Sequence, residues 1–492
     1  MPMSRERTSL LEAIEVGENR IAVSMPDGTL TYRQLRNAVS LLAGELRSEQ
    51  PLALWATPEL ATVIGLCAAL ASGTSVVPLN PKSGEREVEH VLNDAGLSTL
   101  IASPHAALPP LLSSMRRIDV DVALADNQSA PWPDDVPARA STLIMYTSGT
   151  TGPPKGVVLS SSAIQANLEA IASVWGWSEE DHLVHALPLF HVHGLVLGVL
   201  GPLFIGARVS HLGSFSVDGV TEALVAGGSM LFAVPTMYHR VANALDDDPV
   251  LASALAGARL LVSGSGPLMK SDYEKIVRAS GQHVIERYGM TETLFITSAV
   301  PGAPPRPGYV GHALPSVEIR VVDESLVDVP SDDATVGAVL VRSPSLFDGY
   351  LNQPGVTEEA MSDGWFSTGD LGVLASDGAL RLVGRHSTDL IKSGGYRIGT
   401  GEIEQVLFEH SGVEDVAVTG VPDADLGERI VAWIVAGEGA TLDAQELIDF
   451  VALNLTPHKR PREIRFVTQL PRNAMGKIQK HLLTSETTFT RT

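Results

Sequence analysis

The sequence is nearly free of cysteine, since Cys67 is the only one among 492 residues. A single thiol excludes any disulfide within the chain, which is typical of proteins from a reducing compartment. Cys67 lies in the apolar stretch 60–71, where a lone cysteine usually serves as a small buried hydrophobic residue. We therefore expect a core cysteine and not a catalytic nucleophile.

Long hydrophobic runs are also missing. The most apolar stretches, residues 60–71 and 187–205, are short or interrupted by glycine, proline, His191 and His193, whereas a membrane-spanning helix needs about 20 apolar residues. Residues 1–7 lead into no apolar segment of the kind that a signal peptide contains. We expect a cytoplasmic protein without stable membrane insertion.

Positive charge is scarce. The chain has 35 Lys and Arg against 57 Asp and Glu, a formal net charge of −22. An acidic surface repels nucleic acid and anionic lipid, so we expect small-molecule partners and no nucleic acid. A site for an anionic ligand therefore needs positively charged residues close by, against the negative net charge of the whole chain. The sequence does not indicate an oligomeric state.

The N-terminal part of the chain alternates strand-like and helical patterns. A strand over 29–31 leads into a helix, and a strand over 75–79 follows a long helix. This alternation favours an α/β architecture with parallel strands. After the proline-rich residues 301–308, short strands over 317–322 and 337–342 indicate a small β-rich subdomain.

The last hundred residues have a different pattern. Strands are expected over 414–420 and 430–435, and an amphipathic helix over 442–451 with Thr441 as its N-cap. A chain of this length is too long for one hydrophobic core. We predict an N-terminal domain of residues 1–386 and a C-terminal α+β domain of residues 387–492.

The strongest local signal is the run Tyr-Thr-Ser-Gly-Thr-Thr-Gly-Pro-Pro-Lys-Gly at residues 146–156, after a buried strand over 142–146. Glycines let backbone N–H groups approach phosphate oxygens, and Ser and Thr hydroxyls add donors or Mg²⁺ ligands. Lys155 adds a positive charge. The spacing does not fit a Walker A loop, because the fifth residue after Gly149 is Pro154.

This loop resembles the signature of the acyl-adenylate-forming superfamily, which includes acyl-CoA synthetases, luciferases and peptide-synthetase adenylation domains. Further motifs follow in the family's order: residues 288–292 resemble the adenine and magnesium motif, and 367–371 the ribose motif. Residues 384–398 resemble the hinge region, and 472–478 the C-terminal lysine motif. The resemblance implies an α/β fold with a large N-terminal adenylate-forming domain, made of βα subdomains plus a small β-rich subdomain, and a smaller mobile C-terminal domain.

The resemblance also implies roles for individual residues. Lys477 would bridge carboxylate and phosphate during adenylation, while Thr150 and Glu292 would complete the catalytic set and hold Mg²⁺ through hard oxygen ligands. Asp370 would accept hydrogen bonds from the ribose hydroxyls. The residues implied in ATP and AMP binding are Thr147, Ser148, Gly149, Thr151, Gly152, Lys155, Gly264, Ser265, Gly266, Arg287, Tyr288, Gly289, Met290, Thr291, Asp370 and Arg385.

The second half-reaction needs the CoA thiolate to reach the acyl carbonyl, so CoA is the expected co-substrate beside ATP. The family places a glycine-rich loop along the pantetheine tunnel, and its equivalents here are Lys392, Ser393, Gly394, Gly395 and Tyr396. In the family the small domain rotates about a hinge residue that is commonly Asp or Lys. Ser387 stands there in this chain, which puts the pivot in doubt but not the rotation.

The acid substrate is indicated by polar residues where an alkyl pocket would be apolar. Two histidines, His191 and His193, stand where a fatty-acid enzyme typically has one, and Arg240 lies on the helix expected to wall the acyl pocket. Arg287 directly precedes Tyr288, and Ser263 is assigned to the same acid site. Because a buried unpaired charge is costly, these arginines suggest an acid with a second carboxylate. The segments resemble malonyl-CoA synthetases, which implies malonate or methylmalonate as the acid.

Other interpretations stay open. Arg240 could pair with Asp246 or Asp247, Arg287 could pair with a structural carboxylate or a phosphate, and His193 could be a satisfied core histidine. The alternative functions are a short- or medium-chain fatty acyl-CoA ligase, an adenylating enzyme that serves a carrier protein, and a non-catalytic nucleotide-binding module.

Overall fold

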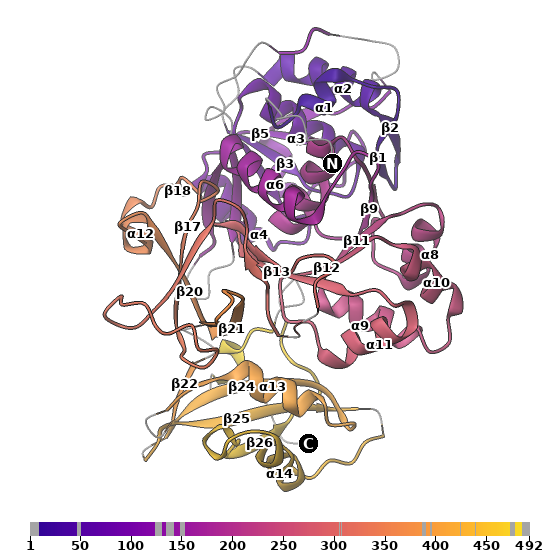
Figure 1. Ribbon diagram of the computed structural model, residues 1–492. Coiled ribbons are helices and arrows are strands. Elements are labelled where there is room, and N and C mark those ends of the chain that lie inside the picture. The colour runs from indigo at the N-terminus through magenta and orange to yellow at the C-terminus, as the bar shows by residue number, and fades with distance from the viewer. Residues whose placement is uncertain are drawn as a thin grey trace. The chain divides into compact units, whose positions relative to one another are not determined.

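The computed structural model (Figure 1) describes most of the chain. The described residues are 9–46, 51–123, 130–133, 142–147, 153–304, 306, 308–385, 390–393, 396–423, 425–437, 439–472 and 478–484. They form two compact units, one of residues 1–318 with 342–366 and one of residues 319–341 with 367–492. The mixed α/β architecture with a large N-terminal part and a smaller C-terminal part confirms the predicted fold class.

A nine-stranded sheet in the first unit has the order β15-β14-β13-β12-β11-β9-β10-β1-β2. Its six inner strands, from β13 to β1, are parallel, and the outer pairings are antiparallel. The strands are β1 (Ile21–Met25), β2 (Gly28–Thr31), β9 (His182–His185), β10 (Arg208–His211), β11 (Met230–Ala233), β12 (Leu260–Ser263), β13 (Val284–Met290), β14 (Leu294–Ser298) and β15 (His312–Ala313).

A seven-stranded sheet in the same unit has the order β18-β8-β7-β4-β3-β5-β6. Strands β7 and β8 form an antiparallel hairpin, and β7 continues the parallel part of the sheet through β4. The strands are β3 (Leu52–Trp55), β4 (Val76–Leu79), β5 (Thr99–Ala102), β6 (Arg116–Asp119), β7 (Thr142–Thr147), β8 (Lys155–Ser160) and β18 (Gly349–Tyr350).

Helices fill the connections of the first unit, as the α/β pattern predicts. In Figure 1, α8 lies beside α10 and α9 beside α11. The elements are α1 (Glu12–Val16), α2 (Tyr32–Leu46), α3 (Leu60–Ser72), α4 (Glu85–Asp94), η1 (Pro110–Ser114), α6 (Ser161–Trp175), η2 (His193–Leu200), α7 (Gly201–Ile205), α8 (Val217–Val225), α9 (Pro235–Ala244), α10 (Pro249–Gly257), α11 (Lys270–Ser280), α12 (Pro354–Ala360) and the short strand β19 (Met361–Ser362).

The apolar stretches noted in the sequence are core elements. Helix α3 is buried almost throughout, including Cys67, whose thiol pKa is raised by burial. The second stretch forms η2 and α7, also buried. Among the described helices, none combines the length and the apolar character that a membrane crossing requires.

The second unit contains two sheets. Most residues of β16 (Glu318–Val322), β17 (Gly337–Arg342), β20 (Trp365–Leu374) and β21 (Leu380–Arg385) form the first sheet. The second has the order β23-β22-β25-β24, with β26 beside β25. Its elements are β22 (Leu390–Ser393), β23 (Tyr396–Gly399), α13 (Thr400–Phe408), β24 (Val413–Asp423), β25 (Gly427–Ala436), α14 (Ala444–Asn454), η3 (Pro457–Lys459), β26 (Glu463–Phe466) and α15 (His481–Thr484).

Strand alternation explains how both faces of the second sheet are buried. Ile430, Ala432 and Ile434 point to one face with α13 and α14, while Val431 and Trp433 point to the other face with residues near the C-terminal end. The helix predicted over 442–451 begins at Ala444, and its N-cap is Asp443 instead of Thr441. The Asp443 side chain accepts hydrogen bonds from two backbone N–H groups of the first turn.

The compact units divide the chain at positions other than the predicted boundary after residue 386. Strand β21 contacts α13, and Gly399 lies so close to Val383 that a side chain on it would collide there. Residues 367–385 therefore pack with the C-terminal part of the chain. The division at 386 and 387, as a boundary of movement, stays a prediction.

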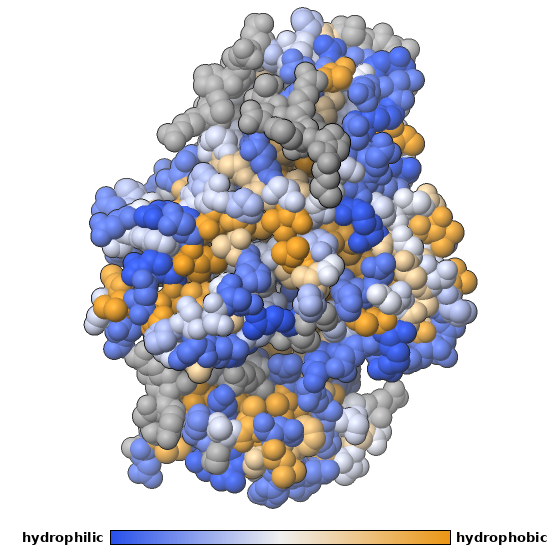
Figure 2. Space-filling model, in the orientation of Figure 1, coloured by the Kyte–Doolittle hydropathy of each residue, from blue (hydrophilic) through white to orange (hydrophobic). Residues whose placement is uncertain are grey.

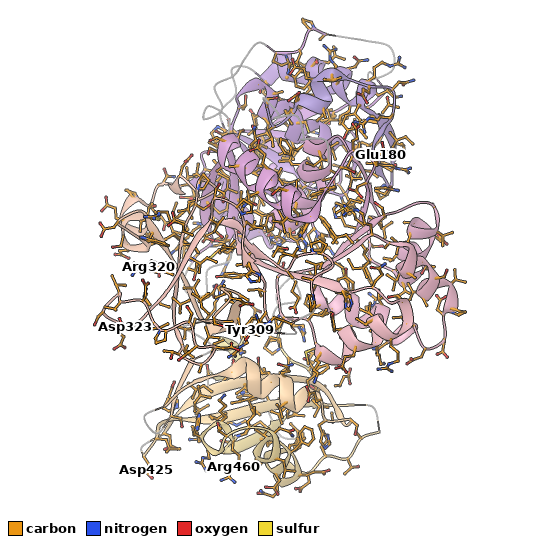
Figure 3. The ribbon with its side chains drawn as sticks, in the orientation of Figure 1. Glu180, Tyr309, Arg320, Asp323, Asp425 and Arg460 are labelled. Atoms are coloured by element: carbon orange, nitrogen blue, oxygen red, sulfur yellow. The ribbon has the colours of Figure 1, made fainter. Side chains whose placement is uncertain are left out.

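Part of the acidic charge lies at the surface. Glu180, Asp323 and Asp425 are exposed and are labelled in Figure 3. Figure 2 shows hydrophilic residues with smaller hydrophobic areas between them on the face in view.

Candidate active site

Four of the predicted site segments of the first unit lie at one edge of the nine-stranded sheet. In Figure 1, β9, β11, β12 and β13 run side by side, and their pairings are parallel. The segments 187–193 and 234–240 come after β9 and β11, and the segment 263–266 starts at the last residue of β12. The segment 287–292 spans the carboxyl end of β13. Ligand sites of parallel α/β sheets lie at this edge.

Arg287 is a buried cation at this edge, with an exposed fraction of 5%. Its Cζ atom lies 4.6 Å from the centroid of the Phe295 ring. Gly264 lies directly against the guanidinium, and a Cβ atom at this position would collide with it. Within the described residues, the Arg287 Nε and Nη2 atoms are buried and have no hydrogen-bond partner. Burial lowers the pKa of Arg287 to about 9, so the guanidinium remains charged at neutral pH.

His193 lies near this cation, and His191 lies near His193. His193 begins η2, and its Nδ1 atom lies 3.4 Å from the Ser265 hydroxyl. Burial, the charge of Arg287 and two neighbouring histidines lower the pKa of His193 well below its usual value, and burial lowers that of His191 to about 4. Both rings are therefore neutral at pH 7. Their Nε2 atoms and the Ser263 hydroxyl are buried without hydrogen-bond partners in the part of the chain that the structure describes.

His185 and His211 are neighbours of this group that the sequence reasoning missed. They end the adjacent parallel strands β9 and β10 in the same register, and their rings lie 4.6 Å apart. The Leu187 N–H group donates to His185 Nδ1 at 3.3 Å, and Leu187 O lies 2.9 Å from His211 Nε2. His185 and His211 thus contact the N–H group and the carbonyl oxygen of Leu187, the first residue of the 187–193 segment. A histidine at the end of two successive strand-like runs was the available signal.

The phosphate loop is described only at its two ends. Thr147 and Lys155 face each other in the β7–β8 hairpin. His90 Nε2 lies 2.8 Å from the Pro154 carbonyl oxygen, and the Tyr146 hydroxyl donates to Asp94 Oδ2 at 2.7 Å. Helix α4 therefore fixes both ends of the loop through protein contacts.

Glu292 is 7% exposed, and its Oε1 atom accepts a hydrogen bond from the Tyr350 hydroxyl at 2.9 Å. Lys155 Nζ lies 5.2 Å from the centroid of the same ring. The sequence reasoning missed Tyr350, because a two-residue strand such as β18 leaves no recognisable pattern.

The adenine motif forms the turn from β13 to β14. Gly289 has no room for a side chain against the Leu294 carbonyl, and the Met290 N–H donates to Thr293 Oγ1 at 3.3 Å. Tyr288 is 8% exposed. Thr291 and Gly266 lie in the predicted segments, and the nucleotide contacts of these residues stay predictions.

The predicted ribose residues of the second unit are neighbours. Asp370 and Arg385 face each other across the antiparallel strands β20 and β21, and Arg385 Nε lies 3.3 Å from Asp370 Oδ1. The Asp370 N–H donates to the Thr368 hydroxyl at 3.1 Å. The structure thus brings together a carboxylate and a guanidinium that the sequence places in separate motifs.

Two family models match the chain: the AMP-binding enzyme model over residues 10–351 and the AMP-binding enzyme C-terminal domain model over residues 402–477. The chain belongs to the AMP-binding enzyme family. It is 34% identical to a mitochondrial malonate–CoA ligase of Bos taurus, over 94% of this chain and 87% of the relative.

Two solved structures extend the comparison. A malonyl-CoA ligase in a ternary product complex with methylmalonyl-CoA and AMP is 49% identical, with a TM-score of 0.73, and covers 94% of this chain and 100% of its own. ATP-bound MatB from Rhodopseudomonas palustris is 30% identical, with a TM-score of 0.87, and covers 97% of this chain and 98% of its own.

The AMP-binding family implies Mg²⁺, and the residues present fit one carboxylate ligand. Glu292 supplies a buried carboxylate with one oxygen held by Tyr350. No group of three or more His, Cys, Asp or Glu residues that could hold a metal occurs among the described residues. A Mg²⁺ ion that takes most ligands from phosphates and water needs only such a sparse protein contribution.

Several predicted residues lie outside the described part of the chain. They are Ser148, Gly149, Thr150, Thr151, Gly152, Ser387, Gly394, Gly395 and Lys477. In the predicted CoA segment, β22 ends at Ser393 and β23 begins at Tyr396, while the side chains of Lys392 and Tyr396 are not described. The roles of all these residues stay predictions.

Arg240 has a different environment from Arg287. It is exposed on α9, and its Cζ atom lies 4.9 Å from the centroid of the Phe215 ring. Within the described residues no ion pair of Arg240 with Asp246 or Asp247 is found, and Asp246 pairs with Lys275 at 3.6 Å. The structure does not place Arg240 in the buried group around Arg287, and its contact with the acid stays a prediction.

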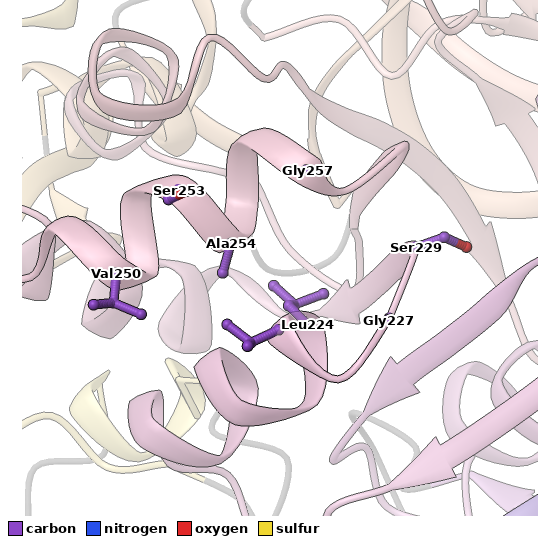
Figure 4. A pocket seen from close by; sticks show the side chains of 9 residues that line it. Leu224, Gly227, Ser229, Val250, Ser253, Ala254 and Gly257 are labelled. Atoms are coloured by element: carbon purple, nitrogen blue, oxygen red, sulfur yellow. The ribbon is translucent and has the colours of Figure 1, made fainter.

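A surface hollow of about 360 Å³ between α8 and α10 lies away from this edge (Figure 4). It includes Ser229, which precedes β11, and Gly227, so it adjoins the amino ends of the strands. Its lining residues are Leu, Val, Ala, Gly and Ser, without a titratable side chain. The hollow is therefore not the catalytic site.

Proposed function

We propose that the chain is an AMP-forming malonate–CoA ligase, which makes malonyl-AMP from malonate and ATP and then malonyl-CoA. The observation that supports malonate most directly is Arg287, a buried guanidinium whose Nε and Nη2 atoms lack partners among the described residues. Leaving a buried charge unpaired costs several kcal/mol, about 3–5. A second carboxylate on the substrate would satisfy it in bidentate geometry.

The neutral histidines support the same substrate. His193 adds hydrogen-bonding capacity beside Arg287 without a second positive charge, because burial lowers its pKa. A dicarboxylate therefore meets one cation at its distal end and keeps the other carboxylate for reaction. A fatty acid would leave Arg287, His191 and His193 facing an alkyl chain, which is unfavourable.

In the first half-reaction a carboxylate oxygen of the acid bonds to the α-phosphorus of ATP, and pyrophosphate leaves. Lys155 adds positive charge near the phosphates, and Lys477 would bridge carboxylate and phosphate. Mg²⁺, when bound with Thr150 and Glu292, supplies charge neutralisation for the phosphate oxygens. Asp370 and Arg385 would hold the ribose.

In the second half-reaction the CoA sulfur bonds to the acyl carbonyl carbon, and AMP leaves with the oxygen that joined it to the acyl group. The loop from Lys392 to Tyr396 would line the path of CoA, after rotation of the C-terminal domain near Ser387. The motif set for both half-reactions supports a catalyst over a nucleotide-binding module. We also keep the cytoplasmic location as a proposal.

The test is AMP release by purified protein with ATP, Mg²⁺ and CoA, run in parallel with malonate, methylmalonate, acetate, butyrate and octanoate. We expect turnover with malonate and its loss by about 10²- to 10³-fold in kcat/KM for Arg287→Ala, the effect of removing one partner of a buried charge pair. Turnover with monocarboxylates alone would reject the malonate assignment and leave the ligase chemistry intact.

A further inference from the structure

Tyr350 lies in a short segment that joins the phosphate-loop hairpin to the turn carrying Glu292. Strand β18 pairs antiparallel with β8, so that Tyr350 faces Val157. The Leu351 N–H donates to the Gly156 carbonyl at 2.7 Å, one residue after Lys155. This end of the segment is therefore fixed to the strand that leaves the phosphate loop.

The other end of the segment is fixed to Glu292. The Phe347 N–H donates to the Glu292 carbonyl at 2.8 Å, and the Phe347 and Tyr350 rings meet edge to face at 4.9 Å. Backbone hydrogen bonds thus link residues 156–158 with residue 292 through residues 347–351. The two segments are far apart in sequence but become parts of one rigid connection.

The Tyr350 side chain also contacts both Glu292 and Lys155. Its hydroxyl donates to Glu292 Oε1 at 2.9 Å, and Lys155 Nζ lies 5.2 Å from its ring centroid. A tyrosine hydroxyl has one proton to donate, and here that proton fixes the Oε1 atom of the Glu292 carboxylate. The ring face attracts the ammonium group by its quadrupole.

The position of Tyr350 is well determined by its surroundings. Its N–H donates to Thr357 Oγ1 at 2.9 Å, which anchors β18 to α12. Gly156 allows the close approach on the other side, because a Cβ atom there would lie 3.2 Å from Leu351 Cβ and 3.1 Å from the Tyr146 ring. The hydroxyl is therefore held at Glu292 by several contacts and not by its own bond alone.

We propose that Tyr350 is a positioning residue for ATP binding: its hydroxyl orients the Glu292 carboxylate toward the magnesium–ATP complex, and its ring holds the Lys155 ammonium group. This inference rests on the proposed function for the role of Glu292. Tyr350 would thus have two separable tasks. Its hydroxyl would affect the Mg²⁺-dependent part of ATP binding through Glu292, and its ring would affect the attraction of Lys155 to the phosphates.

The experiment compares Tyr350→Phe with Tyr350→Leu. The phenylalanine keeps the ring, its contact with Phe347 and the Lys155 contact, and removes only the hydroxyl. The leucine removes the ring contacts as well. ATP affinity is measured by calorimetry without acid or CoA, once with Mg²⁺ and once with EDTA. Tyr273→Phe is the matched control, since the hydroxyl of Tyr273, on α11, lies 2.6 Å from His283 Nδ1 and not at Glu292.

For Tyr350→Phe we expect ATP affinity to fall about 3- to 10-fold with Mg²⁺, the range of one hydrogen bond, and to stay unchanged in EDTA. The KM for malonate should stay unchanged. Tyr350→Leu should weaken ATP binding in both conditions. Tyr273→Phe should change neither affinity.

A double variant completes the test. In a Glu292→Gln background, Tyr350→Phe should cause little further loss, because the two groups act as a unit. Equal weakening by Tyr350→Phe with Mg²⁺ and in EDTA, or full additivity with Glu292→Gln, would overturn the proposal. Binding is measured without acid, so a failure of the malonate assignment appears only in the AMP-release panel.

Discussion

The residues predicted to hold the nucleotide (the nucleotide side) and those predicted to hold the acid (the acid side) differ in whether their buried polar groups have hydrogen-bond partners. On the nucleotide side, Tyr146, His90 and Glu292 have hydrogen-bond partners in the protein itself. On the acid side, Arg287 and His193 bury polar atoms that lack partners among the described residues. Among the described residues, these groups of the nucleotide side are thus satisfied within the protein, whereas those of the acid side are not.

The difference has a physical reason. ATP brings many phosphate oxygens and is held by backbone groups and charges, so the protein gains from a rigid cradle with its own internal bonds. A small diacid offers few contacts, and most of its discrimination comes from polar groups that stay unpaired with the wrong substrate. Arg287 and the histidines can therefore select an acid, at a cost to stability.

The largest expected effect is the separation of activity from stability at Arg287. Arg287→Met replaces a buried charge by an apolar side chain of similar length. We expect the free energy of unfolding to rise, by about 1–4 kcal/mol, while malonate turnover falls about 10²- to 10³-fold. Urea unfolding and AMP release on the same preparations measure the two quantities. A loss of stability together with activity would show that Arg287 has a structural partner.

A second substitution, at the neighbouring Gly264, displaces Arg287. Gly264→Ala puts a Cβ atom where the guanidinium lies, so Arg287 has to move. We expect a rise of about 10-fold or more in the KM for malonate, since the displaced charge no longer meets the distal carboxylate. Steady-state kinetics measure the effect. In an Arg287→Met background the same substitution should change KM much less, and an unchanged penalty there would place the role of Gly264 at the nucleotide.

The nucleotide side should give the opposite pattern. Tyr146→Phe removes the hydrogen bond to Asp94 at 2.7 Å and leaves a carboxylate oxygen without that donor. We expect a loss of about 1–3 kcal/mol in the free energy of unfolding and little change in malonate KM. Urea unfolding measures it, with Tyr273→Phe as a partly exposed control. A gain of stability would contradict the idea that this side is internally satisfied.

The nucleotide side was also the more predictable side. The loop ends at Thr147 and Lys155 and the turn at Tyr288 lie in contiguous motifs, so the sequence alone could locate them. Asp370 and Arg385 each lie in a motif of their own, and the pairing of β20 with β21 makes them neighbours. Tyr350 was missed because its contact with Glu292 joins residues 58 positions apart. Such a contact depends on how β18 pairs with β8, and no pattern in the sequence predicts this pairing.

The acid side was predicted only in part. Arg287, His191, His193 and Ser263 were named from their sequence motifs, but His185 and His211 require the register of β9 and β10. The fold class followed from the strand and helix alternation. The N-cap of α14 was placed two residues early, because Thr441 and Asp443 are both good caps and pattern alone seldom fixes helix ends more closely.

The smallest expected effect is a pH dependence that separates the two kinds of buried group. Burial lowers the pKa of His191 to about 4, so the unfolded chain binds its proton first, near pH 6.5. Stability should therefore fall as the pH drops from about 6.5 towards 4. Burial raises the pKa of Glu286 to about 7, which stabilises the fold at low pH and is lost as the pH rises from about 4.5 to 7.

The two groups oppose each other between about pH 4.5 and 6.5, and substitution separates them. In urea unfolding at several pH values, Glu286→Gln should show a steeper loss of stability on acidification than the unsubstituted chain. His191→Gln should show a shallower one, by up to about 1.4 kcal/mol per pH unit for one proton. Because a glutamine at 191 cannot take up a proton, an unchanged slope would mean that folding does not lower the pKa of His191, and would contradict its burial without a partner on the acid side.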